Sequence, residues 1–219
     1  MTLAELKQII QDKYLHHAPP STKCDCKSYT RWEPKLLGDQ CQLCNHSFND
    51  HNGYGPCTFV IEGGYTLSSG KKSDKYFDIK GLMCESDPCA YLYSALNEFL
   101  DNHWELRESF NCYGGVELGG IPIALMRLSG KNCCFIRKQQ RIHGLKKMIE
   151  GVCKSPVLIV DDVISSGATI INAIDLLRAQ KYTIAGILCV INRMNSEIFH
   201  RNNREEYRVY SLFREGDFQ

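Results

Sequence analysis

The apolar residues of this chain fall into short runs and helically spaced patterns that alternate along most of its length. Runs rich in Val, Ile and Leu with few charges are typical of buried strands. The runs that predict strands are YFDIK (76–80), FNCYGG (110–115), CCFIR (133–137), VLIV (157–160), IAGILCVIN (184–192) and YRVYSLF (207–213).

Helical spacing appears between these runs. The segment SDPCAYLYSALNEFLDNH (86–103) places Tyr91, Leu92, Ala95, Leu96 and Phe99 on one face. The segments IPIALMRLSG (121–130), which has Pro122 at its start and Gly130 at its end, and IINAIDLLRAQ (170–180) also predict helices. Residues 1–17 predict an opening helix with Thr2 and Glu5 in a capping box. Alternating strands and helices predict an α/β fold with a mostly parallel central sheet flanked by helices.

Two acidic residues, Asp161 and Asp162, directly follow the VLIV run, and the small residues 165–169 then open the next helix. Ligands of open parallel sheets bind outside the carboxyl ends of the strands. A loop of small residues at a helix start offers backbone N–H groups to a phosphate. An ordinary capped turn is the simpler interpretation, but it does not account for two adjacent acids. The stretch therefore predicts a sugar phosphate, with its hydroxyls on the acids and its phosphate on 165–169.

The segment VLIVDDVISSGAT (157–169) resembles the motif with which type I phosphoribosyltransferases bind phosphoribosyl pyrophosphate (PRPP). The resemblance implies the type I phosphoribosyltransferase fold and ribose hydroxyls held by Asp161 and Asp162. It also implies that the last five residues of the motif cradle the 5-phosphate. The PRPP-binding residues implied in this way are Asp161, Asp162, Val163, Ile164, Ser165, Ser166, Gly167, Ala168 and Thr169.

A concentrated run of positive charge, RKQQRIHGLKKMIEG (137–151), has no acid before Glu150. A solvated surface loop is the general interpretation, but the position one strand before the motif favours stabilisation of a leaving pyrophosphate. The run resembles the mobile catalytic loop of orotate phosphoribosyltransferases. That loop usually has Lys at the position of Arg141 in this chain. Arg keeps the positive charge but cannot lose its proton. The residues that the resemblance implies at the pyrophosphate, partly across a dimer interface, are Arg137, Lys138, Arg141 and His143.

Three further segments carry the same resemblance. GGVELGGIPIA (114–124) resembles the pyrophosphate-side loop, which implies contacts from Glu117, Leu118, Gly119 and Gly120. YTLSSGKKSDKYFD (65–78) and VINR (190–193) resemble base-site segments, which implies base contacts from Phe77 and Arg193, the latter with the carboxylate of orotate. The chain departs from the family pattern at Ser68, Asp74 and Asn192. We expect a phosphoribosyltransferase domain formed by residues 1–17 and 58–219.

The intervening residues 18–57 are rich in Cys and His and lie outside that resemblance. Clustered Cys and His in a reducing compartment indicate zinc, and a segment this short needs metal to fold. We expect a structural Zn²⁺ held by Cys24, Cys26, Cys41 and Cys44, with His46 or His51 as possible replacements, while free thiols in a loop are the alternative. The thiols outside this segment are expected to be reduced and mostly buried; they are Cys84, Cys89, Cys112, Cys133, Cys134, Cys153 and Cys189.

The formal net charge of +1 gives no overall field toward nucleic acid or a membrane. The amphipathic start of the chain lacks the apolar run of a signal peptide, so we expect an intracellular, cytoplasmic protein. The resemblance implies an orotate phosphoribosyltransferase-like homodimer with a shared active site. Such an enzyme forms orotidine 5′-monophosphate and pyrophosphate from orotate and PRPP, with Mg²⁺ bridging pyrophosphate and ribose hydroxyls. The alternatives are transfer to another nucleobase and a non-catalytic PRPP-sensing regulator.

Overall fold

A computed structural model describes residues 2–17, 65–66, 72–126, 128–139, 147–194, 196–201 and 205–218. The chain divides into two units, His17–Tyr76 and Met1–His16 with Phe77–Gln219. In the described part of the first of these, β2 (Tyr65–Thr66) pairs antiparallel with β3 (Lys72–Ser73). The strand β4 (Lys75–Phe77) runs across the boundary between the units. The Cys-rich segment, with all of its expected zinc ligands, lies outside the described residues.

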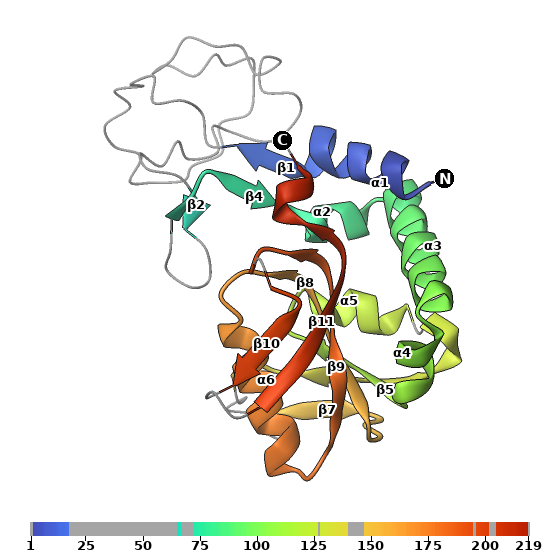
Figure 1. Cartoon of the computed structure of the whole chain (residues 1–219), viewed down its shortest axis with the longest axis vertical. Helices are drawn as coiled ribbons and strands as arrows, with labels where there is room; N and C mark the ends of the chain where they lie inside the picture. The colour runs from blue at the N-terminus through green and yellow to red at the C-terminus, as the bar shows by residue number, and fades with distance from the viewer. Residues whose placement is uncertain are drawn as a thin grey trace, which may run out of the picture. The chain divides into compact units, whose positions relative to one another are not determined.

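The larger unit is built on a seven-stranded sheet with the order β10-β11-β9-β8-β5-β6-β7 (Figure 1). The five inner strands β11, β9, β8, β5 and β6 are parallel, and the two edge strands are antiparallel to their neighbours. The predicted mostly parallel sheet is therefore confirmed. The strands span Cys112–Val116 (β5), Asn132–Ile136 (β6), Ile149–Gly151 (β7), Val157–Ile164 (β8), Ile184–Asn192 (β9), Ile198–Arg201 (β10) and Glu205–Arg214 (β11).

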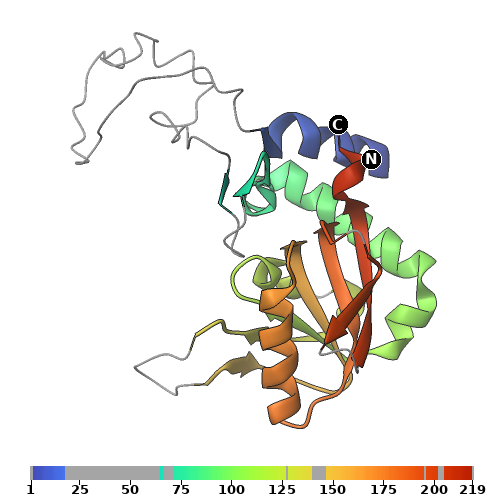
Figure 2. The ribbon, with the colours of Figure 1, turned by 60° about the vertical axis from the view of Figure 1, so that its left-hand side comes forward.

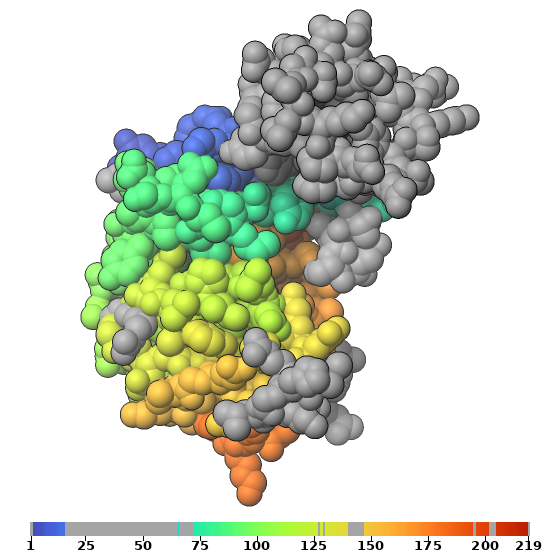
Figure 3. All heavy atoms as spheres, turned by 180° about the vertical axis from the view of Figure 1, so that it is seen from behind, coloured from blue at the N-terminus to red at the C-terminus, as the bar shows by residue number. Residues whose placement is uncertain are grey.

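Helices cover both faces of this sheet. The α-helices of the larger unit span Leu3–Ile9 (α1), Ile79–Cys84 (α2), Ser86–Asn102 (α3), Trp104–Ser109 (α4), Gly120–Leu125 (α5) and Ala168–Ala179 (α6). A π-helix (Ile10–Tyr14) continues α1 and leads into β1 (Leu15–His17), and 3₁₀ turns lie at Leu128–Gly130 and Glu215–Asp217. The helix α6 lies on one face of the sheet and α3 lies on the other (Figure 2). Seen from behind, α3 and α5 form much of the surface over that second face (Figure 3).

The alternation of side chains along the central strands explains the two layers. Leu158 and Val160 of β8 pack into the core under α1, α3 and α5, whereas Val157 and Ile159 pack into the core under α6. Successive residues of a strand point to opposite faces, so a strand covered on both faces is apolar at every position. The uninterrupted VLIV run is therefore a consequence of burial on both sides.

Several predicted elements are confirmed with small changes. Residues 184–192 form β9 with the predicted bounds, and residues 86–102 form α3, which buries Leu92, Leu96 and Leu100. The capping box is present, because the Glu5 N–H donates to the Thr2 hydroxyl at 3.3 Å and the Thr2 N–H donates to Glu5 at 2.6 Å. The predicted opening helix is too long, since regular helix gives way to a π-helix at Ile10 and to strand at Leu15.

The prediction of a strand over 76–80 is wrong in its second half. Strand β4 ends at Phe77, and α2 begins at Ile79 after Asp78, whose carboxylate accepts from the Gly81 N–H at 3.0 Å. An Asp that caps a helix satisfies an N–H group that has no partner inside the helix. This local bond outweighs the strand preference of Ile79, which follows Asp78.

The order of the parallel strands creates a crevice. The chain passes from β5 outward to β6 and then returns to the other side of β5 to form β8. Such a reversal leaves a crevice outside the carboxyl ends of the two strands where ligands bind. The crevice of this fold therefore lies beyond the ends of β5 and β8.

Candidate active site

The acidic pair lies at this crevice. Strand β8 pairs with β5 up to Val160 and continues to Ile164 against β9, so Asp161 and Asp162 follow the point where β5 ends. The prediction that the strand stops before the acids is wrong, because the ladder with β9 holds the acids in extended conformation. Asp161 and Asp162 are nevertheless only 5% and 7% exposed. Two carboxylates removed from water in this way need a positively charged or hydrogen-bonding partner.

Among the residues that the structure describes, few donors meet these carboxylates. Asp161 accepts from the Asp162 N–H at 3.0 Å and from the Thr169 hydroxyl at 3.5 Å, and Lys80 lies 2.8 Å from Asp162. Burial, followed by the neighbouring charge of Asp162, raises the pKa of Asp161 well above its ordinary value. The pair thus has carboxylate oxygens that suit sugar hydroxyls or a hard divalent cation such as Mg²⁺.

The loop after β8 has the geometry expected of an anion site. Gly167 has a φ of 74°, and a Cβ there would lie 2.2 Å from the ring of Phe199, so the position needs glycine. The Ser166 hydroxyl accepts from the Ala168 N–H at 3.4 Å, where α6 begins. The first N–H groups of a helix lack partners within it and carry the positive end of its dipole. The predicted phosphate loop therefore presents a helix start beside the acidic pair.

The loop after β5 lies against the acids. A Cβ at Gly119 would be 2.1 Å from a carboxylate oxygen of Asp162, and one at Gly120 would be 2.0 Å from the Val160 carbonyl oxygen. Only glycine permits this approach of the two loops. The peptide bond between Glu117 and Leu118 is cis. The structure thus brings the predicted pyrophosphate-side loop and the predicted sugar-binding acids together.

The start of the basic run is tied to that loop. The Arg137 Nε lies 2.6 Å from Glu150 Oε1, and its Nη1 lies 3.7 Å from Glu117 Oε1. The Lys138 N–H donates to the Glu117 carboxylate at 3.1 Å. Arg137 therefore links the two ends of the β6–β7 connection to the β5 loop. The other two predicted members of the run, Arg141 and His143, lie outside the described residues.

The two predicted base-site residues also meet. The guanidinium carbon of Arg193 lies 5.6 Å from the centre of the Phe77 ring. The Arg193 side chain is only 7% exposed and pairs with Glu215 at 2.5 Å. Asn192 is fully engaged in a turn, because its side chain donates to the Ser196 carbonyl oxygen and accepts from the Met194 N–H. The departure from the family pattern at Asn192 thus has a structural explanation, while Ser68 lies outside the described residues.

Two charged residues near the site were missed by the sequence analysis. Lys80 was assigned to a strand, whereas its position in the first turn of α2 directs it to Asp162. The capping signal of Asp78 two residues earlier could have identified that helix. Glu215 comes from the turn that follows β11, and no sequence signal pairs it with Arg193.

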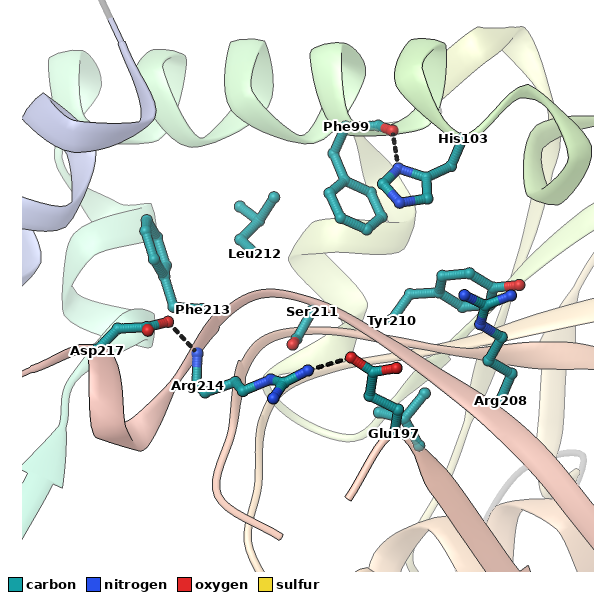
Figure 4. A pocket seen from close by; sticks show the side chains of 11 residues that line it. Phe99, His103, Glu197, Arg208, Tyr210, Ser211, Leu212, Phe213, Arg214 and Asp217 are labelled. Atoms are coloured by element: carbon teal, nitrogen blue, oxygen red, sulfur yellow. Dashed lines mark hydrogen bonds and ion pairs between the residues drawn. The ribbon is translucent and has the colours of Figure 1, made fainter. Parts of the chain in front are cut away.

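A separate hollow of about 300 Å³ lies between α3 and strand β11. Its lining includes Phe99 from α3 and His103, which directly follows that helix, together with Arg208, Tyr210 and Arg214 from β11 (Figure 4). Arg214 is paired with Glu197 at its rim. None of the predicted site residues that the structure describes lines this hollow, so the candidate site remains at the ends of β5 and β8.

The buried acid gives a testable dependence of stability on pH. Above the raised pKa of Asp161 the folded protein bears the cost of a buried charge. Below the ordinary pKa both folded and unfolded states are protonated and the cost vanishes. Asp161→Asn carries no charge, so without divalent ions we expect it to melt a few degrees higher than wild type near about pH 8. The difference should shrink toward about pH 4. Melting curves across this range test the expectation, and a difference that grows on acidification contradicts it.

No helix in the described part of the chain combines the length and apolar character that a membrane crossing requires.

A family model described as phosphoribosyl transferase domain matches residues 129–211. The chain is 33% identical over 135 residues to orotate phosphoribosyltransferase of Pyrococcus horikoshii, which covers 60% of this chain and 71% of the relative. It is 32% identical over 157 residues to the enzyme of the same name from Pyrococcus abyssi, covering 68% of this chain and 82% of the relative.

Solved structures agree with this similarity. Orotate phosphoribosyltransferase from Aeropyrum pernix superimposes with a TM-score of 0.55 at 25% identity, covering 71% of this chain and 87% of that chain. UMP synthase of Leishmania donovani superimposes with a TM-score of 0.56 at 25% identity, covering 71% of this chain and 33% of that chain. The type I phosphoribosyltransferase fold expected from the sequence is confirmed.

Proposed function

Because the chain belongs to the orotate phosphoribosyltransferase family, we propose that it joins orotate to PRPP and forms orotidine 5′-monophosphate and pyrophosphate. The chain is thus a pentosyltransferase of pyrimidine nucleotide biosynthesis. The observation that carries the substrate assignment is the placement of the acidic pair between a glycine loop and a helix start. These three features match the ribose, the pyrophosphate and the 5-phosphate of PRPP.

PRPP would lie across the carboxyl ends of β8 and β5. Asp161 and Asp162 would accept hydrogen bonds from the ribose hydroxyls, and residues 165–169 would donate backbone N–H groups to the 5-phosphate. Ribose hydroxyls would supply the donors that the buried carboxylates need. The carboxylate that accepts from the Thr169 hydroxyl is already aligned by the first turn of α6.

The pyrophosphate would lie toward the loop of Glu117, Leu118, Gly119 and Gly120. Glycosyl transfer breaks the bond between ribose C1 and the pyrophosphate oxygen while a ring nitrogen of the base bonds to C1, so negative charge grows on the leaving group. Arg137, Lys138, Arg141 and His143 would stabilise that charge. Mg²⁺, when bound with PRPP, would neutralise part of the pyrophosphate charge, and Asp161 and Asp162 would hold it. The oxygen-rich acidic pair fits such a complex.

The base would bind near Phe77 and Arg193. Aromatic contact and a buried guanidinium suit a flat, anionic pyrimidine such as orotate. The Arg193 guanidinium already forms an ion pair with Glu215, with 2.5 Å between Nη2 and Oε1. We infer that orotate competes with this internal carboxylate, so that Glu215 sets part of the cost of base binding.

The base site gives a prediction with two variants. Glu215→Gln removes the competing charge and should lower KM for orotate several-fold, because an ordinary charge-assisted hydrogen bond contributes about 1.5–3 kcal/mol and only part of it is recovered. Arg193→Ala should raise KM for orotate while leaving PRPP affinity near the wild-type value. Steady-state kinetics with each substrate varied in turn measure both effects. A rise in KM for PRPP with no change for orotate would contradict the base-site assignment.

The function itself is tested by the ultraviolet absorbance of orotate in the presence of PRPP and Mg²⁺. Loss of the orotate signal with release of pyrophosphate supports the proposal. A panel of other nucleobases tests the alternative of a different acceptor, which the departures at Ser68 and Asp74 motivate. PRPP binding without turnover on any base would favour the alternative of a PRPP-sensing regulator.

The remaining expectations stay part of this proposal. We propose that residues 18–57 form a module that holds a structural Zn²⁺ through Cys24, Cys26, Cys41 and Cys44, inserted into a domain formed by residues 1–17 and 58–219. We also propose a cytoplasmic homodimer in which the basic run of one subunit reaches the site of the other. Zinc analysis of the purified chain and its mass in solution test these two points.

A further inference from the structure

Three cysteines that are far apart in the sequence come together in the sheet. The sulfur atoms of Cys112, Cys134 and Cys153 all lie within 4.8 Å of one another. Cys112 begins β5, Cys134 lies in β6, and Cys153 follows β7 by two residues. The strand register pairs Cys134 with Gly151, and Cys112 lies diagonally from Cys134, opposite Asn132. Three adjacent strands thus direct thiols to one point on the face covered by α6.

The surroundings suit a buried site that solvent can reach. Cys112 and Cys134 are fully buried, while Cys153 is partly exposed and gives access from solvent. The Cys112 thiol donates to the Val152 carbonyl oxygen at 3.1 Å. A metal ion would replace the thiol protons, so its binding would release them.

Ordinary packing of small apolar side chains is the simplest alternative. It accounts for Cys189, which is buried in β9 beside Asp161, and for Cys133, which faces the other side of β6. Packing alone gives no reason for the sulfur atoms of three cysteines to lie within 4.8 Å of one another. Within the described residues, this group alone gathers three or more side chains with the spacing of metal ligands.

We propose that Cys112, Cys134 and Cys153 form a structural binding site for a thiophilic metal ion, with Zn²⁺ favoured over Cu⁺. Thiolates select both ions. Three thiolates leave a net charge of −1 around Zn²⁺ and −2 around Cu⁺, and the smaller charge costs less in an apolar core. Sulfur ligands about 2.3 Å from a tetrahedral ion lie about 3.8 Å apart, so the cluster must contract by about 1 Å at most. Water, or the hydroxyl of Tyr182 that bonds to Cys153, is available as a fourth ligand.

The position of the site suggests what the ion does. Cys112 starts β5, about 13 Å along the strand from the end that meets the crevice. The ion is therefore separate from the transfer chemistry. It would join β5, β6 and the segment after β7, and β6 and β7 flank residues 137–148, which hold the cations of the basic run. The site would therefore fix the two strands that begin and end the segment with the catalytic cations.

The test uses the full chain, purified with reductant and without oxygen, and titrated with Zn²⁺ and with Co²⁺ as a spectroscopic probe. Wild-type protein should bind one more ion than Cys153→Ser, whose substitution at a partly exposed position preserves folding. The sulfur-to-cobalt charge-transfer absorption should be weaker in Cys153→Ser than in wild type. Cys153→Ser should bind the metal ion more weakly than wild type, and the loss should exceed the roughly 10–100-fold that follows removal of a residue that only contacts a metal ligand. Cys134→Ala is the second variant, and Cys133→Ala on the opposite face of the same strand is the matched control.

The comparison of variants separates this site from a zinc in residues 18–57, because that zinc is present in all of them. Zn²⁺ should raise the melting temperature of wild type and Cys133→Ala more than that of Cys153→Ser. Binding of Cu⁺ in place of Zn²⁺, lost in the same variants, also supports the site and identifies the other ion. Equal metal content and equal charge transfer in wild type, Cys153→Ser and Cys134→Ala overturn the proposal.

Discussion

Asp161→Asn combined with Asp162→Asn is expected to lower kcat/KM for PRPP by about 10²–10⁴-fold. Each carboxylate would lose a charge-assisted hydrogen bond to a ribose hydroxyl, at about 1.5–3 kcal/mol each. The two losses together amount to about 3–6 kcal/mol, and each 1.36 kcal/mol is a factor of ten. Calorimetric titration with PRPP and Mg²⁺, followed by initial rates at saturating orotate, measures the effect on binding and on turnover.

The matched control for the acidic pair is Asp175→Asn on α6. Asp175 is about half exposed and pairs with Arg201 outside the crevice, so its removal should leave PRPP binding unchanged. The double variant should remain folded, because Asp161 destabilises the folded protein when it is charged. Wild-type kcat and KM in the folded double variant would show that the ribose is bound elsewhere.

The acidic pair illustrates a conflict between stability and function. Asp161 is buried beside a like charge, an arrangement whose charged form costs free energy when no ligand is present. The charge of Lys138 offsets part of this cost for Asp161, while Lys80 of α2 pairs with Asp162. The remaining part is recovered when hydroxyls or a divalent cation arrive, so the same burial that weakens the free enzyme strengthens its affinity for ligand. An inactive variant that melts at a higher temperature than wild type is the expected signature.

The sequence predicted the parts of the site that depend on local patterns. The run from Val157 to Thr169 predicted a strand, two acids, a loop of small residues and a helix start in consecutive order, and the structure has all four. The role of that loop in binding phosphate stays a prediction. Because β8 and β9 are buried on both faces, they are apolar at nearly every position, and these apolar runs predicted both strands. Gly119 and Gly120 were predicted from resemblance, and the structure gives the reason, which is the contact of their backbone with β8.

The parts that sequence analysis missed depend on contacts between distant segments. Lys80 reaches Asp162 across 82 positions of the chain, and Glu215 reaches Arg193 from the turn after the last strand. The three clustered thiols, expected only to be reduced and mostly buried, meet because of the strand order. Strand order arises from packing of the whole sheet, and neither periodicity nor charge along the chain reveals it.

Arg141→Ala is expected to lower kcat by roughly 10²–10³-fold, the usual effect of removing one group that stabilises developing negative charge. The leaving pyrophosphate gains charge as the C1–O bond breaks, so a cation beside it contributes more in the transition state than in the ground state. KM for orotate should change little, because the base lies at the other side of ribose C1. Single-turnover and steady-state rates with Mg²⁺ measure the loss.

Two Arg variants separate charge from position. Arg141→Lys should retain most of the activity if positive charge is what matters, since Lys keeps the charge but not the planar donor pattern. Arg137→Ala should lower thermal stability as well as rate, because Arg137 is largely buried and holds Glu117 and Glu150. Arg141→Ala should lower the rate without loss of stability. If Arg141→Ala instead raises only KM for the base, the cation acts in base binding and the assignment to the leaving group is wrong.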